Sequence, residues 1–277
     1  MPDSNTWFFE ELQGVKLIRF SHLSKFPELI HFVTTRVGGV SEDNSFSMNI
    51  GFVYHDNPEN VIENRKILAN ALQIPFDSFI FERQIHSDNT IIVSKKDKGR
   101  GLLLKEDAIQ DNDGFIIQLP GICPVALHAD CTPVLLYDPV KKVAATIHAG
   151  WRSTLKFIAR KGVERMCREF GTNPADILAG IGPSNGPCCY EVGDEVIQEV
   201  KKVFPQQCYH ILLPKVNSKT HFDQWQANKI QLIQAGLEEN NIVICDICVF
   251  HNPDLFFSSR YNNKVTGRMG AGVMIRK

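Results

Sequence analysis

The sequence lacks long apolar runs and has no excess of charge of one sign. No stretch of its 277 residues approaches the ~18 uninterrupted apolar residues of a membrane-spanning helix, so we expect no membrane partner. Its 30 lysines and arginines balance 31 aspartates and glutamates, which removes the usual electrostatic reason to expect a nucleic-acid partner. A small anionic substrate remains compatible with this balance, because it needs only a few well-placed cations.

Targeting signals and repeats are missing as well. The first residues, MPDSNTWFFEELQG, carry acids where a secretory signal has lysine or arginine, and no apolar segment follows, so we expect a cytoplasmic protein. In that compartment its 8 cysteines are expected to be reduced thiols. Without repeats or a Pro/Ser-rich linker, the chain is expected to form one domain over residues 1–277. The sequence does not indicate an oligomeric state.

Apolar periodicity predicts an α+β fold with mixed sheets. Four helices are expected, with Asn57 capping the first and Ser153 the second, over Pro58–Leu72, 154–170, 194–204 and 224–235. Short β-rich segments predict strands at 79–85, 90–93, 114–119, 125–127, 133–137, 143–148, 177–181, 243–250 and 265–275. Many adjacent strands with few helices between them argue against a doubly wound parallel sheet.

The segment HADCTPVLLYDPVKKVAATIHAGWRST carries the most chemistry. Two apolar strands flank Asp138-Pro139-Val140-Lys141, which has the residues of a tight turn. If that turn closes the hairpin, Cys131 and His148 lie directly opposite each other, with Cβ atoms roughly 5 Å apart. Such a pair can bind zinc or form a nucleophile with its base. It is equally compatible with a buried cysteine beside a hydrogen-bonded histidine.

Residues next to this pair suggest an anion site. Arg152 follows His148 closely, at the start of the helix that Ser153 is expected to cap, and free N–H groups beside an arginine attract anions. The loop GIGPSNGPCCYEVG is rich in glycine but matches no standard phosphate-binding motif. We expect Cys188 and Cys189 to be structural, and Cys245 and Cys248 to face opposite sides of a strand as packing residues. Surface or packing positions are expected for His22, His31, His210, His221 and His251.

Taken in order, the motifs of the chain resemble the YfiH-type family. Its members are also called laccase-domain proteins, polyphenol oxidases, peptidoglycan editing factors and purine nucleoside phosphorylases. The resemblance covers nearly the whole chain, through FVTTRVGGVS, MNIG, NPENVIENR, QIHS, NDG, ADC, HAGWR, GIGPSNGPCCYEVG, FDQWQANK, FFSSR and TGRM. It implies a single α+β domain of mixed sheets layered between helices.

The resemblance also implies one Zn²⁺ site. Matching the motifs residue by residue makes His86, Cys131 and His148 its ligands, and three protein ligands leave a fourth position open, as in catalytic zinc sites. Three departures from the family pattern stand out. His128 replaces a small or hydroxylic residue before the ADC motif, Ser153 follows HAGWR in place of glycine, and Arg260-Tyr261 replaces a pair of arginines.

The activity that the resemblance implies is phosphorolysis of adenosine, inosine, guanosine and methylthioadenosine, with adenosine deamination as a further activity. A phosphate cradle is expected from Arg36, Arg152 and Arg268, although Arg36 can equally tie a turn. Asp113 and Asp130 are the carboxylates to consider as general acid or base. Polar substrate contacts are expected from Asn49 and Gln84.

Three other functions remain open at this point. A copper-dependent polyphenol oxidase is disfavoured, because the 9 histidines include no His-x-His pair, so we expect any Cu²⁺ to be adventitious. Cys131 and His148 can instead act without metal as a thiol hydrolase on a peptidoglycan precursor. A non-catalytic zinc-binding module would need a fourth protein ligand, for which His128 is the candidate.

Overall fold

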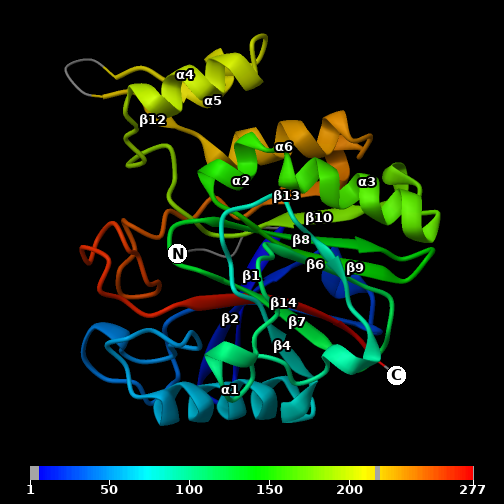
Figure 1. The fold of residues 1–277 in the computed structure, drawn as a ribbon, viewed down its shortest axis with the longest axis vertical. Helices are drawn as coiled ribbons and strands as arrows, with labels where there is room; N and C mark the ends of the chain where they lie inside the picture. The colour runs from blue at the N-terminus through cyan, green and yellow to red at the C-terminus, as the bar shows by residue number, and fades with distance from the viewer. Residues whose placement is uncertain (1–5, 216–218, 277) are drawn as a thin grey trace.

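The computed structural model describes residues 6–215 and 219–276. The first five residues, which belong to the segment examined for a secretory signal, lie outside it. Two sheets stack face to face between layers of helices (Figure 1). This arrangement confirms the predicted α+β class with mixed sheets layered between helices. In the described part of the chain, no helix has the length and apolar character needed to cross a bilayer.

The first sheet combines strands from both ends of the chain. Its central strand β14 (Met269–Ile275) pairs antiparallel with β3 and β7, whereas β4 joins β7 in parallel. The neighbouring strands are, in order, β1 (Trp7–Leu12), β2 (Val15–Phe20), β3 (Leu29–Thr34), β14, β7 (Cys123–His128) and β4 (Phe79–Phe81).

The second sheet is built around one long hairpin. Strands β8 (Thr132–Asp138) and β9 (Val143–Ala149) pair antiparallel along their full length. The order of strands is β13 (Ile242–Ile244), β10 (Leu178–Ile181), β8, β9, β6 (Gly114–Ile117) and β5 (Ile91–Ile92). A small separate sheet pairs β11 (Leu212–Leu213) with β12 (His221–Phe222).

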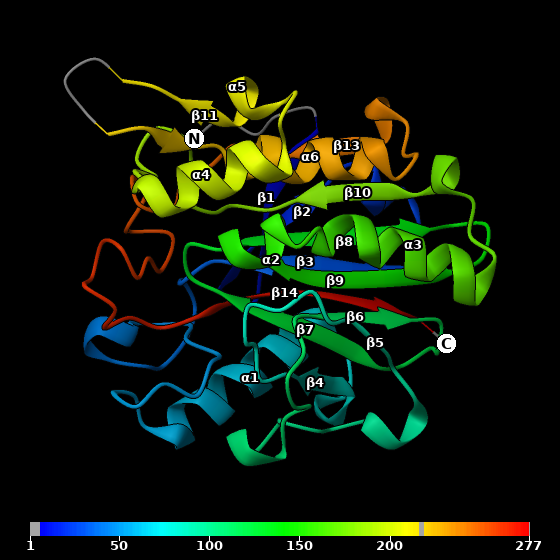
Figure 2. The same cartoon turned by 45° about the horizontal axis from the view of Figure 1, so that its top comes forward.

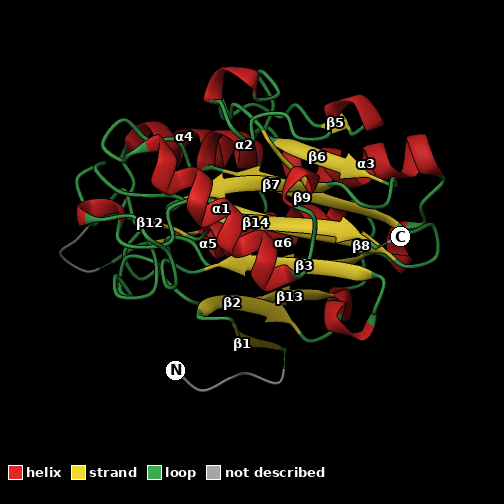
Figure 3. Ribbon diagram, turned by 90° about the horizontal axis from the view of Figure 1, so that it is seen from below, coloured by secondary structure: helices red, strands yellow, loops and turns green. Residues whose placement is uncertain are grey.

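Helices cover the outer faces of both sheets. Helix α1 (Pro58–Leu72) lies across the first sheet, as the view from below in Figure 3 shows. The second sheet is covered by α3 (Ile158–Phe170) and α6 (Gln224–Gln234), and α2 (Trp151–Leu155), α4 (Asp194–Val203) and α5 (Cys208–Ile211) complete that side (Figure 2). As predicted, Asn57 caps α1, its side chain accepting a hydrogen bond from the amide of Glu59.

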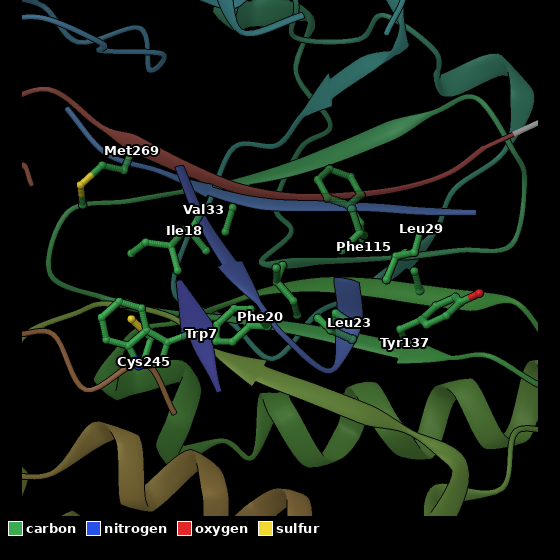
Figure 4. Close-up of a cluster of buried hydrophobic side chains, with 14 of the residues drawn as sticks. Trp7, Ile18, Phe20, Leu23, Leu29, Val33, Phe115, Tyr137, Cys245 and Met269 are labelled. Atoms are coloured by element: carbon green, nitrogen blue, oxygen red, sulfur yellow. The ribbon is translucent and has the colours of Figure 1, made fainter. Parts of the chain in front are cut away.

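The main core lies between the two sheets. Ile18, Val33 and Met269 from the first sheet meet Phe115 and Tyr137 from the second (Figure 4). Along β8, successive side chains alternate between this core and the layer under α3 and α6, because strand residues point to opposite faces. Both faces of each sheet are therefore covered, which explains the continuous apolar runs in the hairpin sequence.

The second predicted helix is interrupted. Phe157, with a left-handed φ of +64°, separates α2 from α3. The N-cap residue of α2 is Gly150 and not Ser153, which lies buried within the helix. Because α2 has only 5 residues, its dipole is small, and the anion site expected at its N-terminus is not supported. The fourth helix ends within one residue of its predicted bounds, at Gln234.

The predicted hairpin register is wrong by two residues. Asp138 pairs with Val143, so that His148 lies opposite Pro133 and not opposite Cys131. The reason is the turn, in which the Asp138 carboxylate accepts hydrogen bonds from the amides of Val140 and Lys141 and extends the loop. A shift of two residues leaves each side chain on its original face, so Cys131 and His148 still share one side of the hairpin.

Candidate metal centre

Three side chains that the sequence analysis named as ligands meet where the chain passes from the first sheet to the second. Cys131 lies in the link between β7 and β8, His148 near the end of β9, and His86 in the loop after β4. The Sγ atom of Cys131 lies 3.7 Å from Nε2 of His86. The ring centroids of His86 and His148 are 4.9 Å apart, and one donor atom of each residue lies within 4.8 Å of the other two.

Asp113 holds two of these residues in place. Its carboxylate accepts a hydrogen bond from Nδ1 of His148 at 2.9 Å, which leaves Nε2 to face the cluster. The same carboxylate accepts hydrogen bonds from the amides of His86 at 3.0 Å and Ser87 at 2.6 Å. A carboxylate behind a histidine is the usual second partner of a metal-ligating imidazole. The fully buried Asp113 therefore lies behind the ligands, where it positions them.

Glycine is required beside the cluster. A Cβ atom at Gly150 would lie 2.5 Å from Cδ2 of His86 and 3.1 Å from Sγ of Cys131. The first distance is far below a van der Waals contact, so any side chain at this position would displace His86. The backbone of His86 itself has a φ of +57°, a left-handed conformation that is uncommon for residues other than glycine. The local chain is thus built to bring this imidazole close to Cys131.

Burial and charge shift the pKa values of the cluster in opposite directions. Burial alone would raise the pKa of Cys131, but His148 and His86 outweigh it and lower the pKa to about 6. Burial alone would lower the pKa of His148, whereas Cys131 and Asp113 raise it to about 10. Cys131 is therefore readily a thiolate, the form that both binds metals and acts as a nucleophile.

The donor set fits a small tetrahedral ion. Bond lengths of about 2.0–2.1 Å to nitrogen and about 2.3 Å to sulfur place two such ligands roughly 3.5 Å apart, close to the 3.7 Å between His86 Nε2 and Cys131 Sγ. Among residues 6–215 and 219–276, His128 is not part of the group that can share one ion. The closed four-ligand module considered from the sequence is therefore not supported, and three protein ligands leave a position open.

A cavity of about 680 Å³ adjoins the cluster. All three ligands line it, together with the cationic side chains of Arg260, Lys264 and Arg268 and the aromatic rings of Trp151 and Tyr190. The guanidinium of Arg260 lies 4.9 Å from the Tyr190 ring centroid. A second cavity of about 440 Å³ shares Gln84, Leu127, Lys264 and Arg268 with the first. The cluster of His86, Cys131 and His148 thus faces a space with positive charge and flat apolar surfaces.

Two polar residues of this cavity have unusual environments. His128 is 1% exposed, and neither ring nitrogen has a hydrogen-bond partner among residues 6–215 and 219–276. Asp130 accepts hydrogen bonds from the Ser258 hydroxyl at 2.6 Å and the Arg260 amide at 2.9 Å. Burial outweighs these bonds and raises the pKa of Asp130 to about 7. Of the two carboxylates considered from the sequence, Asp130 lines the cavity and Asp113 does not.

The other residues named from the sequence divide into two groups. Gln84 and Arg268 line the cavity, and their role as substrate contacts stays a prediction. Asn49 instead bonds its own turn and the Arg268 amide, and the Arg36 guanidinium donates to the carbonyls of Phe46 and Pro253. Arg152 is exposed, with its guanidinium 4.0 Å from the Trp151 ring centroid. The proposed phosphate cradle is therefore not supported for Arg36 or Arg152, and Asn49 positions Arg268.

Sequence reasoning missed the cations that replace them. Arg260 and Lys264 lie in the segment between β13 and β14, more than a hundred residues from Cys131 in the chain. The available signal was the FFSSR motif, which ends in Arg260 and lacks the second arginine of the family pattern. Tyr190 ends the segment GIGPSNGPCCY, whose local pattern likewise gives it no link to the cavity.

The chain is similar to known proteins over most of its length. A purine nucleoside phosphorylase of Bacteroides thetaiotaomicron is 34% identical over 95% of this chain and 97% of its own length. An adenosine deaminase, RL5, from an unknown prokaryotic organism is 33% identical over 87% of this chain and 92% of its own. The crystal structure of YfiH from Bacillus licheniformis superposes with a TM-score of 0.91 at 31% identity, covering 97% and 99% of the two chains. Residues 30–276 match the family model of the multi-copper polyphenol oxidoreductase laccases, and the chain belongs to that family, which confirms the YfiH-type resemblance.

Proposed function

We propose that this protein is a zinc-dependent purine nucleoside phosphorylase. The observation that carries the proposal is the three-ligand centre of His86, Cys131 and His148, open toward a cavity lined by Arg260, Lys264 and Arg268. A phosphate and a purine need cations and flat apolar surfaces in one space. The named activity of the Bacteroides relative supports the same substrate class.

Each part of the site has a place in phosphorolysis. A phosphate oxygen forms a bond to the anomeric carbon of the sugar while the bond from that carbon to the purine nitrogen breaks. The electron pair of the broken bond leaves with the base, which takes up a proton. Arg260, Lys264 and Arg268 bind the phosphate, and the Tyr190 ring offers a face for the purine. Asp130, with its pKa near 7, is placed to donate the proton.

The metal would contribute Lewis acidity. A zinc ion held by the two imidazoles and the thiolate would supply a centre that polarises and orients an oxygen atom in the cavity. Three protein ligands suit this chemistry, because a fourth would close the position. Zinc is preferred to copper because the mixed sulfur and nitrogen donors lie near tetrahedral spacing, which zinc favours.

Adenosine deamination is a second candidate, favoured by the place of Asp130. Deamination replaces the purine amino group by the oxygen of water, and the departing ammonia needs a proton. A carboxyl group whose pKa is about 7 can take a proton from water and later give it up at neutral pH. The named activity of the RL5 relative supports this candidate.

Product analysis tests both activities. The purified protein is incubated with adenosine, inosine, guanosine and methylthioadenosine, each with and without phosphate. Free base plus sugar 1-phosphate, formed only with phosphate, is the expected result, and inosine formed from adenosine without phosphate identifies deamination. Activity should disappear with a strong chelator and return with Zn²⁺. Nucleoside turnover that survives the chelator would contradict zinc dependence. Cleavage of a peptidoglycan precursor in chelator, without nucleoside turnover, would favour a thiol hydrolase, and phenol oxidation with copper and no nucleoside turnover would favour the polyphenol oxidase.

A further inference from the structure

A second group of metal-binding side chains lies away from the first. It consists of Cys188, Cys189, Cys248 and His251, and one donor atom from each lies within 4.8 Å of all the others. We call these four residues the cysteine cluster. The sulfur atoms of Cys189 and Cys248 are 3.2 Å apart, and Sγ of Cys188 lies 3.2 Å from Nδ1 of His251. None of these residues lines the cavity at the first centre.

Two loops bring the four residues together, one after β10 and one after β13. The strand predicted over 243–250 ends at Ile244, so Cys248 does not take the alternating position expected of it. Beyond that point the loops run side by side, with Ser184 bridged to Cys248 and the Val249 amide donating to the Ser184 carbonyl at 3.0 Å. Cys248 therefore faces the adjacent cysteines, and the packing role expected for it is incomplete.

Local turns direct the four donors toward one point. The amides of Cys189 and Tyr190 both donate to the Gly186 carbonyl, so the chain turns tightly through the two adjacent cysteines. Cys248 and His251 are separated by two residues, a spacing found between paired ligands in zinc-binding motifs. The Asn252 side-chain amide donates to the Cys248 carbonyl at 2.8 Å and fixes this second turn.

We propose that the cysteine cluster is a second zinc site, with a structural role. Three thiolates and one imidazole are a standard complete ligand set for tetrahedral zinc, which needs no fifth group. In such a site the sulfur atoms are roughly 3.8 Å apart and sulfur and nitrogen roughly 3.5 Å, so the observed separations of 3.2 Å require only small shifts. A disulfide would use two of the four donors and leave the other two without a purpose.

The surroundings of this cluster suit a bound metal ion in two respects. The amide of Gly186 points at Sγ of Cys248 at a distance of 3.3 Å, a contact that stabilises negative charge on sulfur. Cys188 and His251 are exposed, so an ion from solvent can reach the site.

Zinc here would fix one wall of the main cavity. Tyr190 directly follows Cys189 and lines that cavity, and Asn185 in the same loop does so as well. A metal joining Cys188 and Cys189 to Cys248 and His251 would link this loop to the segment that leads toward Arg260. The inference concerns the second cluster only and stands whether or not the protein acts on nucleosides.

Metal counting in variants tests the inference. The full chain is expressed with zinc, purified without chelator, and its zinc per chain measured by elemental analysis. We expect two equivalents in the wild type and one in His86→Ala. The double variant Cys188→Ser/His251→Gln changes two exposed residues and should also hold one equivalent. Its matched control is Cys208→Ser/His210→Gln, a neighbouring cysteine and histidine outside the cluster, which should keep two.

Two further measurements guard against misfolding and oxidation. Cobalt titrated into metal-free His86→Ala should give the intense thiolate-to-metal charge-transfer bands of a tetrahedral sulfur-rich site, and hydrogen exchange at the amides of Cys189 and Tyr190 should slow on binding. One equivalent in the wild type that vanishes entirely in His86→Ala would overturn the inference. So would a second equivalent that persists in Cys188→Ser/His251→Gln, or a thiol count of six of the 8 cysteines after unfolding without reductant.

Discussion

The carboxylate of Asp113 lies 2.9 Å from Nδ1 of His148 and also accepts the amide of His86. One buried side chain therefore sets the ring orientation of one ligand and the backbone position of another. Asp113 lies directly before β6 and joins the end of β9 to the loop after β4. This relationship makes Asp113 a positioning residue, since it does not line the cavity where substrate would bind.

Replacing Asp113 with asparagine should weaken metal binding without unfolding the protein. The amide keeps the size of the carboxylate but loses the charge that orients His148, and such partners typically contribute about 10–100-fold to metal affinity. The measurement is zinc retention against a graded series of chelator concentrations. Asp111→Asn, an exposed aspartate two residues away, serves as the control. Equal retention in the two variants would contradict the assigned role.

Gly150→Ala should abolish metal binding at the first centre. The added methyl group would lie 2.5 Å from His86 Cδ2, so His86 must move away from Cys131. Overpacking of this kind costs about 1–3 kcal/mol of stability, which a domain of this size can tolerate. Elemental analysis should show the loss, whereas Gly193→Ala, where no atom lies within 4 Å of the added Cβ, should bind normally. Normal zinc content in Gly150→Ala would show that His86 is not a required ligand.

Local signals in the sequence predicted the helices best. Helix α1 has the predicted bounds because Asn57, Pro58 and a regular apolar stripe act within one segment. The first three strands, Trp7–Leu12, Val15–Phe20 and Leu29–Thr34, were missed. Gln13 and Gly14, both with positive φ, form the tight turn between the first two strands. The pairs Phe8-Phe9 and Glu10-Glu11 break the alternation of apolar and polar residues that would mark the first strand. A strand's end depends on its partner, so the length of β13 could not be read from Val243–Phe250.

For the site residues too, local sequence signals gave correct predictions and distant contacts were missed. Cys131 and His148 were paired from the hairpin between them, and the error of two residues did no harm because strand faces alternate. Arg260 and Lys264 reach the cavity from a distant loop, where nothing in their local sequence marks them. The cysteine cluster was missed for a related reason, since reading Cys248 as a strand residue separated it from Cys189. Contacts between loops are set by tertiary packing, which local patterns do not encode.

Arg260→Gln should raise the KM for phosphate. A hydrogen bond to a charged group contributes about 1.5–3 kcal/mol, which corresponds to roughly 10–100-fold in KM. Steady-state kinetics at saturating nucleoside, with phosphate varied, provide the measurement. Arg152→Gln is the matched control, because that guanidinium packs on Trp151 and does not line the cavity. A large rise in the KM for phosphate in the Arg152 variant, with none in the Arg260 variant, would instead favour the phosphate site that the sequence predicted at Arg152.

His31 should lower the stability of the protein on mild acidification, against the opposite effect of Asp130 and Glu82, whose pKa values burial raises to about 7 and about 8. Burial holds the pKa of His31 well below its ordinary value of 6.5, and Nε2 accepts the Phe20 amide at 2.9 Å. Below pH 6.5 the unfolded chain therefore binds a proton at this residue that the folded chain does not, so the free energy of unfolding falls as the pH falls. The maximum slope for one such group is about 1.4 kcal/mol per pH unit. Burial lowers the pKa of His22 to about 4 and of His128 to about 3, so both add to the slope.

Urea unfolding at several values between pH 7 and pH 5 measures this effect. The free energy of unfolding should depend less steeply on pH in His31→Gln, whose side-chain oxygen can still accept the Phe20 amide. His210→Gln, at an exposed site, should follow the wild type. Identical slopes for His31→Gln and the wild type would mean that His31 is protonated in the folded protein.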